Sequence, residues 1–238
     1  MTLTSCLQGS DGLVFSTDSR GTFGDPRSLT AQNDTMKKLY PTSKYSALMV
    51  SGANQQGDMI MDEVEKSIQQ TKIEGATNVM QKIREIARLR FNEWFPSFPF
   101  QAHPAVAAPA RPNLAFIIGG YDLENGIPKT QRIYTIVSNQ DYAPNLHDFG
   151  FALSGVPQYA TYLLNRLYNQ GMKIADLLPL AAYIITETAS QDGKVGGPIQ
   201  IGTITPAEGV KVLTPDEIGQ IVKSNEDKAK KLKGLFQG

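Results

Sequence analysis

Cysteine and histidine, the side chains of the commonest nucleophile–base pairs, are scarce in this 238-residue chain. The chain holds one cysteine, Cys6, and two histidines, His103 and His147, which lie far apart in the sequence. No G-x-S-x-G motif surrounds a serine, so the common Ser–His–Asp and Cys–His arrangements are disfavoured. A single cysteine also disfavours a disulfide framework and multi-cysteine zinc sites, and we expect no metal and no cofactor.

Thr2 offers a different route to nucleophilic catalysis. It follows Met1, and because threonine is small we expect an aminopeptidase to remove the methionine. The freed α-amine has an ordinary pKa of about 7.7–8.0, so it can act as a base near neutral pH. One residue would then supply both the nucleophile and the base. If Met1 stays in place, Thr2 carries an amide there instead, and activity should collapse.

Short polar and glycine-containing motifs follow Thr2 along the chain. They are DSRGT (18–22), KKLY (37–40), VSG (50–52), IGGYD (118–122), SGVP (154–157) and DGKVGG (192–197). In this order and spacing they closely resemble the β-type subunits of the proteasome, which are N-terminal-nucleophile hydrolases. The resemblance extends from Thr2 to about Leu213, nearly the whole chain.

The resemblance implies catalytic roles for the matching residues. Thr2 would be the nucleophile, and Asp18 would orient the catalytic lysine, Lys38. The positive charge of that lysine would lower the pKa of the Thr2 hydroxyl and amine. The backbone N–H of Gly52 would donate to the oxyanion. The outer residues that hold the N-terminus in the family are matched here by Ser154 and Asp192.

The resemblance also implies a surface that binds an extended peptide as an added strand. The backbone positions that would pair with this peptide are Gly21, Thr22 and Ala53. The side chains that would line an apolar specificity pocket are Met36, Tyr40 and Val50. Arg20 matches a structural basic position.

Several features depart from the common β-subunit pattern. About four extra residues lie between Arg20 and Lys38, within 23–33, and they should lengthen a hairpin at the mouth of the site. Val195 stands where the family usually has a serine, so a hydroxyl that would bond the terminal amine is lost. With a Pro-rich loop, a long C-terminal helix and a start at Met1-Thr2, the chain is most similar to the bacterial ancestral-β (Anbu) type.

Hydrophobic periodicity predicts the elements that must position these residues. Strands are predicted at 3–7, 12–17, 36–40, 45–51, 114–121, 132–137, 149–154, 199–204 and 210–213. Helices are predicted at 57–71, 75–91, 157–169, 173–190 and, after a capping box at Thr214, at 215–236. Strand runs separated by helix pairs favour an α+β fold, a four-layer αββα sandwich of two antiparallel sheets. We expect a single domain over 1–238.

The Pro-rich stretch 92–112 is predicted to be a loop, since proline disrupts both helices and ladders. It contains aromatic side chains that are unusual in a solvated linker, namely Trp94, Phe95, Phe98 and Phe100. They either pack onto the parent domain or form a contact between subunits.

Composition limits the possible partners. The 23 basic residues balance 23 acidic ones, which disfavours a nucleic-acid surface. No run of about 18 apolar residues and no signal-peptide pattern occur, so we expect no membrane association and a cytoplasmic location.

The main functional hypothesis is a threonine peptidase that hydrolyses peptides or unfolded proteins in a homo-oligomeric ring or open ring. An ATPase partner follows by analogy only. One alternative is a non-catalytic subunit that keeps the fold for assembly. Another is an N-terminal-nucleophile amidase or acyl transferase that acts on a small molecule.

Overall fold

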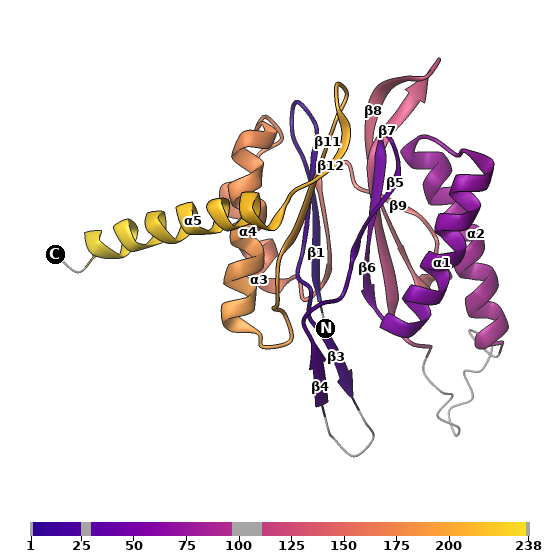
Figure 1. The fold of residues 1–238 in the computed structure, drawn as a ribbon, viewed down its shortest axis with the longest axis horizontal. Coiled ribbons are helices and arrows are strands. Elements are labelled where there is room, and N and C mark those ends of the chain that lie inside the picture. Colours follow the sequence, from indigo (N-terminus) through magenta and orange to yellow (C-terminus); the bar gives the residue numbers. More distant parts are fainter. Residues whose placement is uncertain (1, 25–29, 97–110, 237–238) are drawn as a thin grey trace.

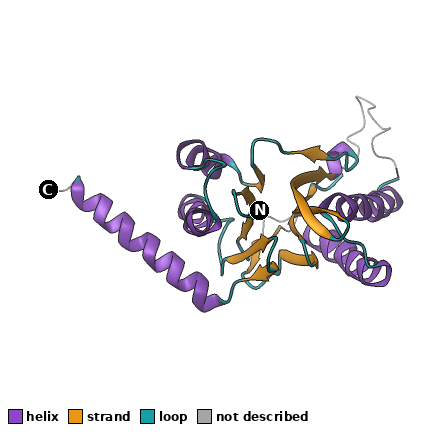
Figure 2. Cartoon of the chain, turned by 90° about the horizontal axis from the view of Figure 1, so that it is seen from above, coloured by secondary structure: helices purple, strands orange, loops and turns teal. Residues whose placement is uncertain are grey.

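Two five-stranded antiparallel sheets lie face to face between two pairs of helices (Figures 1 and 2). The computed structural model describes residues 2–24, 30–96 and 111–236. The predicted four-layer αββα sandwich is confirmed. Part of the predicted hairpin extension at 23–33 lies outside the described residues, as do Phe98, Phe100 and His103.

Each sheet brings together strands that are distant in the sequence. The first sheet has the order β10 (Phe151–Gly155), β1 (Leu3–Gln8), β2 (Leu13–Thr17), β11 (Gln200–Thr205) and β12 (Gly209–Val212). The second has the order β5 (Leu39–Ser43), β6 (Ser46–Gly52), β7 (Leu114–Glu124), β8 (Ile127–Val137) and β9 (Asn145–Leu146). A separate hairpin is formed by β3 (Gly21–Gly24) and β4 (Thr30–Asn33).

Helices cover the outer face of each sheet. The second sheet is covered by α1 (Asn54–Thr71) and α2 (Ala76–Trp94), and the first by α3 (Gln158–Leu167) and α4 (Ile174–Gln191). The central strands are therefore buried on both faces, which explains why β1, β2 and β6 are almost continuously buried rather than alternating. A short 3₁₀ turn, η1 (Ser138–Gln140), follows β8.

The space between the sheets is filled by a third hydrophobic cluster, distinct from the two under the helices. It includes Cys6 and Phe15 from the first sheet and Met49 and Ile117 from the second, all fully buried. Cys6 is a buried free thiol whose pKa is raised by burial, as expected for a small core residue.

Two predicted boundaries were wrong in places that matter for the site. Pairing of the strand predicted at 36–40 begins only at Leu39, because the backbone of Met36 bonds instead to Ser19. Helix α2 continues to Trp94, so residues 92–94 of the predicted loop are helical. The first proline of that stretch is Pro96, and its steric restriction reaches back only to the residue before it.

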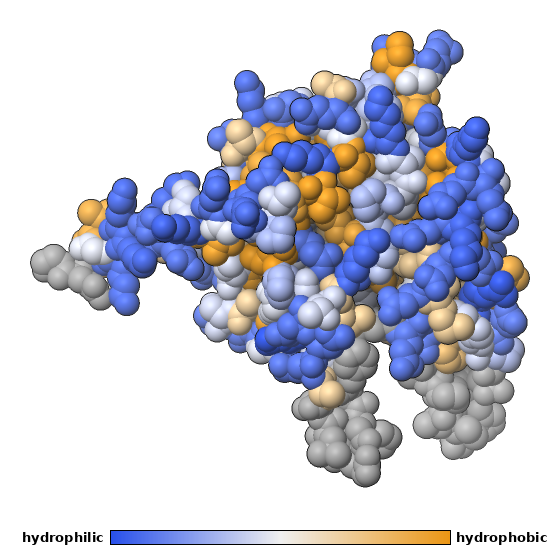
Figure 3. Space-filling model, in the orientation of Figure 1, coloured by the Kyte–Doolittle hydropathy of each residue, from blue (hydrophilic) through white to orange (hydrophobic). Residues whose placement is uncertain are grey.

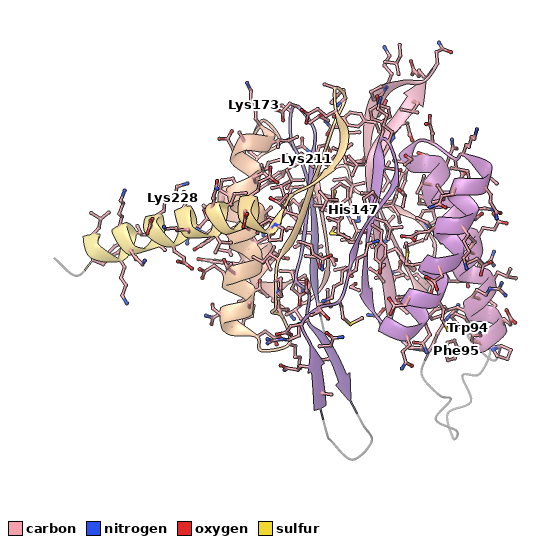
Figure 4. The ribbon with its side chains drawn as sticks, viewed as in Figure 1. Trp94, Phe95, His147, Lys173, Lys211 and Lys228 are labelled. Carbon is pink, nitrogen blue, oxygen red and sulfur yellow. The ribbon has the colours of Figure 1, made fainter. Side chains whose placement is uncertain are left out.

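Trp94 and Phe95 pack onto the parent domain. Both rings lie within 6 Å of the Phe91 ring, at centroid distances of 5.8 and 5.4 Å, and both flank the hydrophobic cluster beneath α2. Figure 4 places them at the end of α2.

The last helix, α5 (Pro215–Leu235), extends away from the body (Figures 1 and 2). Its start is fixed by a capping box in which Thr214 and Glu217 bond reciprocally. Ile218 is its one buried residue, and hydrophilic side chains cover most of its protruding part, whereas hydrophobic ones gather where it meets the body (Figure 3). Within the described residues, no helix is both long and apolar enough to cross a membrane.

The two sheets approach each other so closely at Gly119 that a side chain there would contact the facing sheet. A Cβ there would lie 2.7 Å from Phe15 Cζ and 2.9 Å from Cys6 Sγ, both in the facing sheet. We therefore expect Gly119→Ala to lower the free energy of unfolding by about 1–3 kcal/mol, as overpacking does. Gly219→Ala, at a helical position with nothing within 4 Å, should be neutral or stabilising by up to about 1 kcal/mol. Urea unfolding of both variants checks this, and equal values would contradict it.

Candidate active site

The ends of three strands bring Thr2, Asp18 and Lys38 together. Thr2 precedes β1, and Asp18 follows β2. The two strands are antiparallel neighbours with Thr4 opposite Thr17, so the start of one lies beside the end of the other. Lys38 enters from the second sheet, directly before β5.

The Lys38 ammonium lies at the centre of the cluster. Its Nζ donates to Thr2 Oγ1 at 2.6 Å, to Asp18 Oδ1 at 2.9 Å and to the Arg20 carbonyl at 2.7 Å. These acceptors match the three donors of an ammonium group. Thr2 and Lys38 are each 3% exposed and Asp18 is fully buried, so the charged pair is shielded from bulk water.

Asp18 is held by backbone donors as well as by the lysine. Its Oδ1 accepts from the Leu3 N–H, and its Oδ2 accepts from the N–H groups of Arg20 and Gly196, each at 3.1 Å. These donors come from three separate segments of the chain, so the carboxylate has a fixed place and orientation. Through its hydrogen bond with Lys38 Nζ, the carboxylate in turn orients the ammonium.

Burial and charge act in opposite directions on Lys38. Burial lowers the pKa of its ammonium below the ordinary value, and the charge and hydrogen bond of Asp18 offset part of this shift. A cation beside the Thr2 hydroxyl stabilises the oxygen as it loses its proton. The arrangement can therefore activate a hydroxyl nucleophile, provided that a base receives the proton.

Arg20 joins the base of the β3–β4 hairpin to the loop that follows α4. Its guanidinium contacts both carboxylate oxygens of Asp34, at 2.7 and 2.8 Å, and donates to the Gly193 carbonyl at 2.9 Å. The hydrogen bond from Arg20 lowers the pKa of the Asp34 carboxyl. A Cβ on Gly196 would lie 2.7 Å from Arg20 Cζ, so a side chain there would displace the guanidinium from its present position.

Gln200 also holds this region, and sequence reasoning did not single it out. Its side chain contacts the backbone of Met36, Lys38 and Leu39 and the hydroxyl of Ser19. A glutamine at the start of a strand carries no motif, so the sequence holds no signal for this role.

The outer residues make other contacts. Ser154 Oγ shares a hydrogen bond with Ser51 Oγ at 2.7 Å, and Asp192 Oδ1 accepts from the Lys194 N–H at 2.9 Å. Val195 is 1% exposed and belongs to the hydrophobic cluster beneath α3 and α4. Within the described residues, no hydrogen bond joins the Ser154 or Asp192 side chain to Thr2.

Gly52 ends β6 at the same edge of the molecule. Its φ is +105°, and a Cβ there would lie 2.1 Å from the Asn113 carbonyl oxygen, so the position requires glycine. Its neighbour Ser51 contacts Ser154 on β10, the strand beside β1. The backbone of residue 52 is therefore held near the start of β1, where an oxyanion donor is expected.

The residues predicted to bind substrate differ in exposure. Tyr40 and Val50 are each 8% exposed and share a hydrophobic cluster against which Ala53 packs. Met36 is half-buried beside Ser19. Gly21 and Thr22 lie on β3, where Thr22 Oγ1 is buried and has no hydrogen-bond partner among the described residues.

Other candidate chemistry lies apart from this cluster. The His147 ring shares a hydrogen bond with Thr135 on β8 and contacts the Phe149 ring. Within the part of the chain that the structure describes, no group of three or more His, Cys, Asp or Glu residues could hold a metal ion.

Comparison with known proteins finds a relative among proteasome subunits. The chain is 28% identical over 232 residues to a proteasome subunit beta of Methanocaldococcus vulcanius, covering 97% of this chain and 93% of that protein. The chain is similar to proteasome β subunits, as predicted. No protein-family model matches it.

Solved Anbu structures have the same fold. Anbu of Pseudomonas aeruginosa, solved as a helical assembly, aligns with a TM-score of 0.75 at 16% identity over 99% of this chain and 95% of that one. Anbu of Yersinia bercovieri aligns with a TM-score of 0.74 at 14% identity over 99% and 96%. The resemblance to the ancestral-β type therefore extends to the fold.

Removing Asp18 tests how much the buried pair depends on it. Asp18→Ala leaves the Lys38 ammonium buried without its counter-charge and leaves three N–H groups without their acceptor. We expect a loss of about 3–5 kcal/mol in the free energy of unfolding. Lys38→Met should destabilise less, because Asp18 then keeps its three backbone donors. Guanidinium unfolding of both variants measures the difference, and the reverse order would contradict it.

Proposed function

We propose that this chain is a threonine peptidase of the proteasome β kind, with Thr2 as its N-terminal nucleophile. The observation that carries the proposal is the Lys38 ammonium, which donates to both Thr2 Oγ1 and Asp18 Oδ1 in a buried site. Removal of Met1 is part of the proposal, because it frees the α-amine of Thr2 to act as the base.

The proposed reaction has two stages. Thr2 Oγ attacks the carbonyl carbon of a peptide bond, and its proton passes to the α-amine and then to the leaving amine. The oxygen of the tetrahedral intermediate accepts a hydrogen bond from the Gly52 N–H. An ester on Thr2 Oγ remains, and a water molecule that gives its proton to the α-amine hydrolyses it and releases the acid.

The β3 strand and the end of β6 supply the proposed substrate groove. Gly21, Thr22 and Ala53 would hydrogen-bond an extended peptide through their backbones.

We propose that copies of this chain assemble into a ring or open ring in the cytoplasm, each copy as a single domain. Support comes from the similarity to proteasome β subunits and from the helical assembly of the Pseudomonas aeruginosa Anbu protein.

A second candidate is a subunit without peptidase activity. It is favoured by the outer residues, since Ser154 bonds Ser51, Asp192 bonds the backbone of Lys194, and Val195 is buried in the core. A terminal amine at Thr2 would therefore lack a serine hydroxyl at position 195. In this candidate Met1 is retained and the Asp18–Lys38 pair serves only to stabilise the fold.

The state of the N-terminus and the Thr2 hydroxyl together distinguish the two candidates. We expect the intact mass of the purified protein to lack one methionine, and we expect Thr2→Ala to lower peptide hydrolysis by at least about 10³-fold. Thr4→Ala, which changes a buried threonine two residues along β1, is the matched control and should keep activity. A Thr2→Ala protein that cleaves fluorogenic peptides at the wild-type rate would refute the proposed peptidase.

The rate of hydrolysis should depend on pH as a bell-shaped curve. The acid limb reports loss of the proton from the Thr2 α-amine, at or below its ordinary pKa of about 7.7–8.0 because Lys38 is cationic. The alkaline limb reports loss of the proton from Lys38, below 10.5 because burial lowers this pKa. Measuring kcat/KM between pH 5 and pH 10 at about 0.15 M ionic strength checks this. A rate that still rises at pH 10 would contradict the role of Lys38 as a cation.

A further inference from the structure

We propose that Gln200 is a positioning residue for the active site, holding the backbone of Lys38 so that its ammonium reaches Thr2. The proposal rests on the proposed function and deepens it. It concerns a residue that belongs to none of the motifs and lies at the start of β11, in the first sheet, whereas Lys38 leads into β5 of the second.

The carboxamide of Gln200 makes four hydrogen bonds. Its Oε1 accepts from the N–H of Lys38 at 3.0 Å and from the N–H of Leu39 at 3.2 Å. Its Nε2 donates to the Ser19 hydroxyl and to the Met36 carbonyl, each at 2.7 Å. A carboxamide has two donors and two acceptor sites, so its whole capacity is used.

These contacts join the segments on which the catalytic geometry depends. Ser19 follows Asp18, which holds the Lys38 ammonium, while Met36 and Leu39 flank Lys38 in the chain. Gln200 itself pairs with Thr17 on β2, the residue directly before Asp18. One side chain thus fixes the backbone of the lysine relative to the strand that carries its carboxylate.

The Lys38 backbone fixes the point from which the side chain reaches toward Thr2. A lysine side chain has a long flexible stem, and its end is defined here by Thr2, Asp18 and the Arg20 carbonyl. Residue pairing in β5 begins at Leu39, and the Lys38 carbonyl before it accepts from the Val50 N–H of β6 at 3.1 Å. The N–H groups of Lys38 and Leu39 share one acceptor, Gln200 Oε1. Without this oxygen, the N–H groups of Lys38 and Leu39 lose their acceptor at the point where the strand begins.

Two substitutions with side chains as long as glutamine distinguish the hydrogen bonds of Gln200 from its packing. Gln200→Met keeps the shape but makes none of the four hydrogen bonds. Gln200→Glu keeps an acceptor for the N–H groups of Lys38 and Leu39 and loses the N–H donors to Met36 and Ser19. Because a displacement near 1 Å can lower a rate by about 100-fold, we expect Gln200→Met to lower kcat about 10- to 100-fold. Gln200→Glu should keep more of kcat than Gln200→Met.

Gln131→Ala is the matched control. Gln131 is also half-buried, and its Nε2 donates to the Gly9 carbonyl and to the Tyr121 hydroxyl. Gly9 follows the end of β1 opposite to Thr2, so this variant loses two side-chain hydrogen bonds far from the site. It should leave kcat and the pH profile unchanged.

The experiment measures kcat, KM and the pH profile for a fluorogenic peptide, together with the labelling rate of Thr2 by a peptidyl vinyl sulfone. Thermal unfolding verifies that each variant is folded. For Gln200→Met, KM should change less than about threefold while kcat falls, and the alkaline limb should move because the surroundings of Lys38 change. If both Gln200 variants unfold, Ser19→Ala removes one of the four bonds and should lower kcat by a few-fold.

The outcomes distinguish this proposal from the proposed function. Wild-type protein that neither hydrolyses peptides nor is labelled at Thr2 would refute the peptidase, and the role of Gln200 would fall with it. Active wild-type protein with folded Gln200 variants that match Gln131→Ala in kcat, labelling rate and pH profile would overturn the positioning role alone.

Discussion

The buried ion pair between Asp18 and Lys38 is the interaction on which the rest of the site depends. Two opposite charges away from bulk water are stable only with good geometry and further hydrogen bonds. Both conditions are met, since Asp18 accepts from three backbone N–H groups in addition to the lysine, and Lys38 donates to three acceptors. The pair is therefore fixed by the fold, and it holds a cation against the hydroxyl of Thr2.

The two-sheet architecture explains how such a pair can form. Asp18 belongs to the first sheet and Lys38 leads into the second, so the pair spans the edge at which the two sheets meet. The Arg20–Asp34 ion pair and the Gln200 carboxamide reinforce the same edge from either side. A site built across two sheets is rigid because the core between them is close-packed, as the approach of Gly119 to Phe15 shows.

The outer part of the site differs from its inner part. Thr2, Asp18 and Lys38 contact one another, while Ser154, Asp192 and Val195 are engaged elsewhere. Valine at position 195 serves the hydrophobic core beneath α3 and α4, where a serine hydroxyl would need a partner. The inner cluster places a cation against the Thr2 hydroxyl, and the outer residues are where the peptidase and the non-catalytic candidates diverge.

The sequence by itself determined the order of the elements and the four-layer arrangement. Hydrophobic periods of 2 and 3.6, the capping box at Thr214 and the turn residues are local signals, and local signals define strands and helices. The resemblance to proteasome β subunits, carried by the short motifs along the chain, also grouped Thr2, Asp18 and Lys38 before their distances were known.

Only the tertiary structure decided which residues hold that group in place. Gln200 lies 162 positions from Lys38 along the chain, and no local pattern relates a strand-initial glutamine to a distant backbone N–H. The start of β5 pairing at Leu39, the Ser51–Ser154 contact and the burial of Val195 likewise depend on which strands meet. Such contacts are properties of the packed chain, because the free energy that selects them comes from segments far apart in sequence.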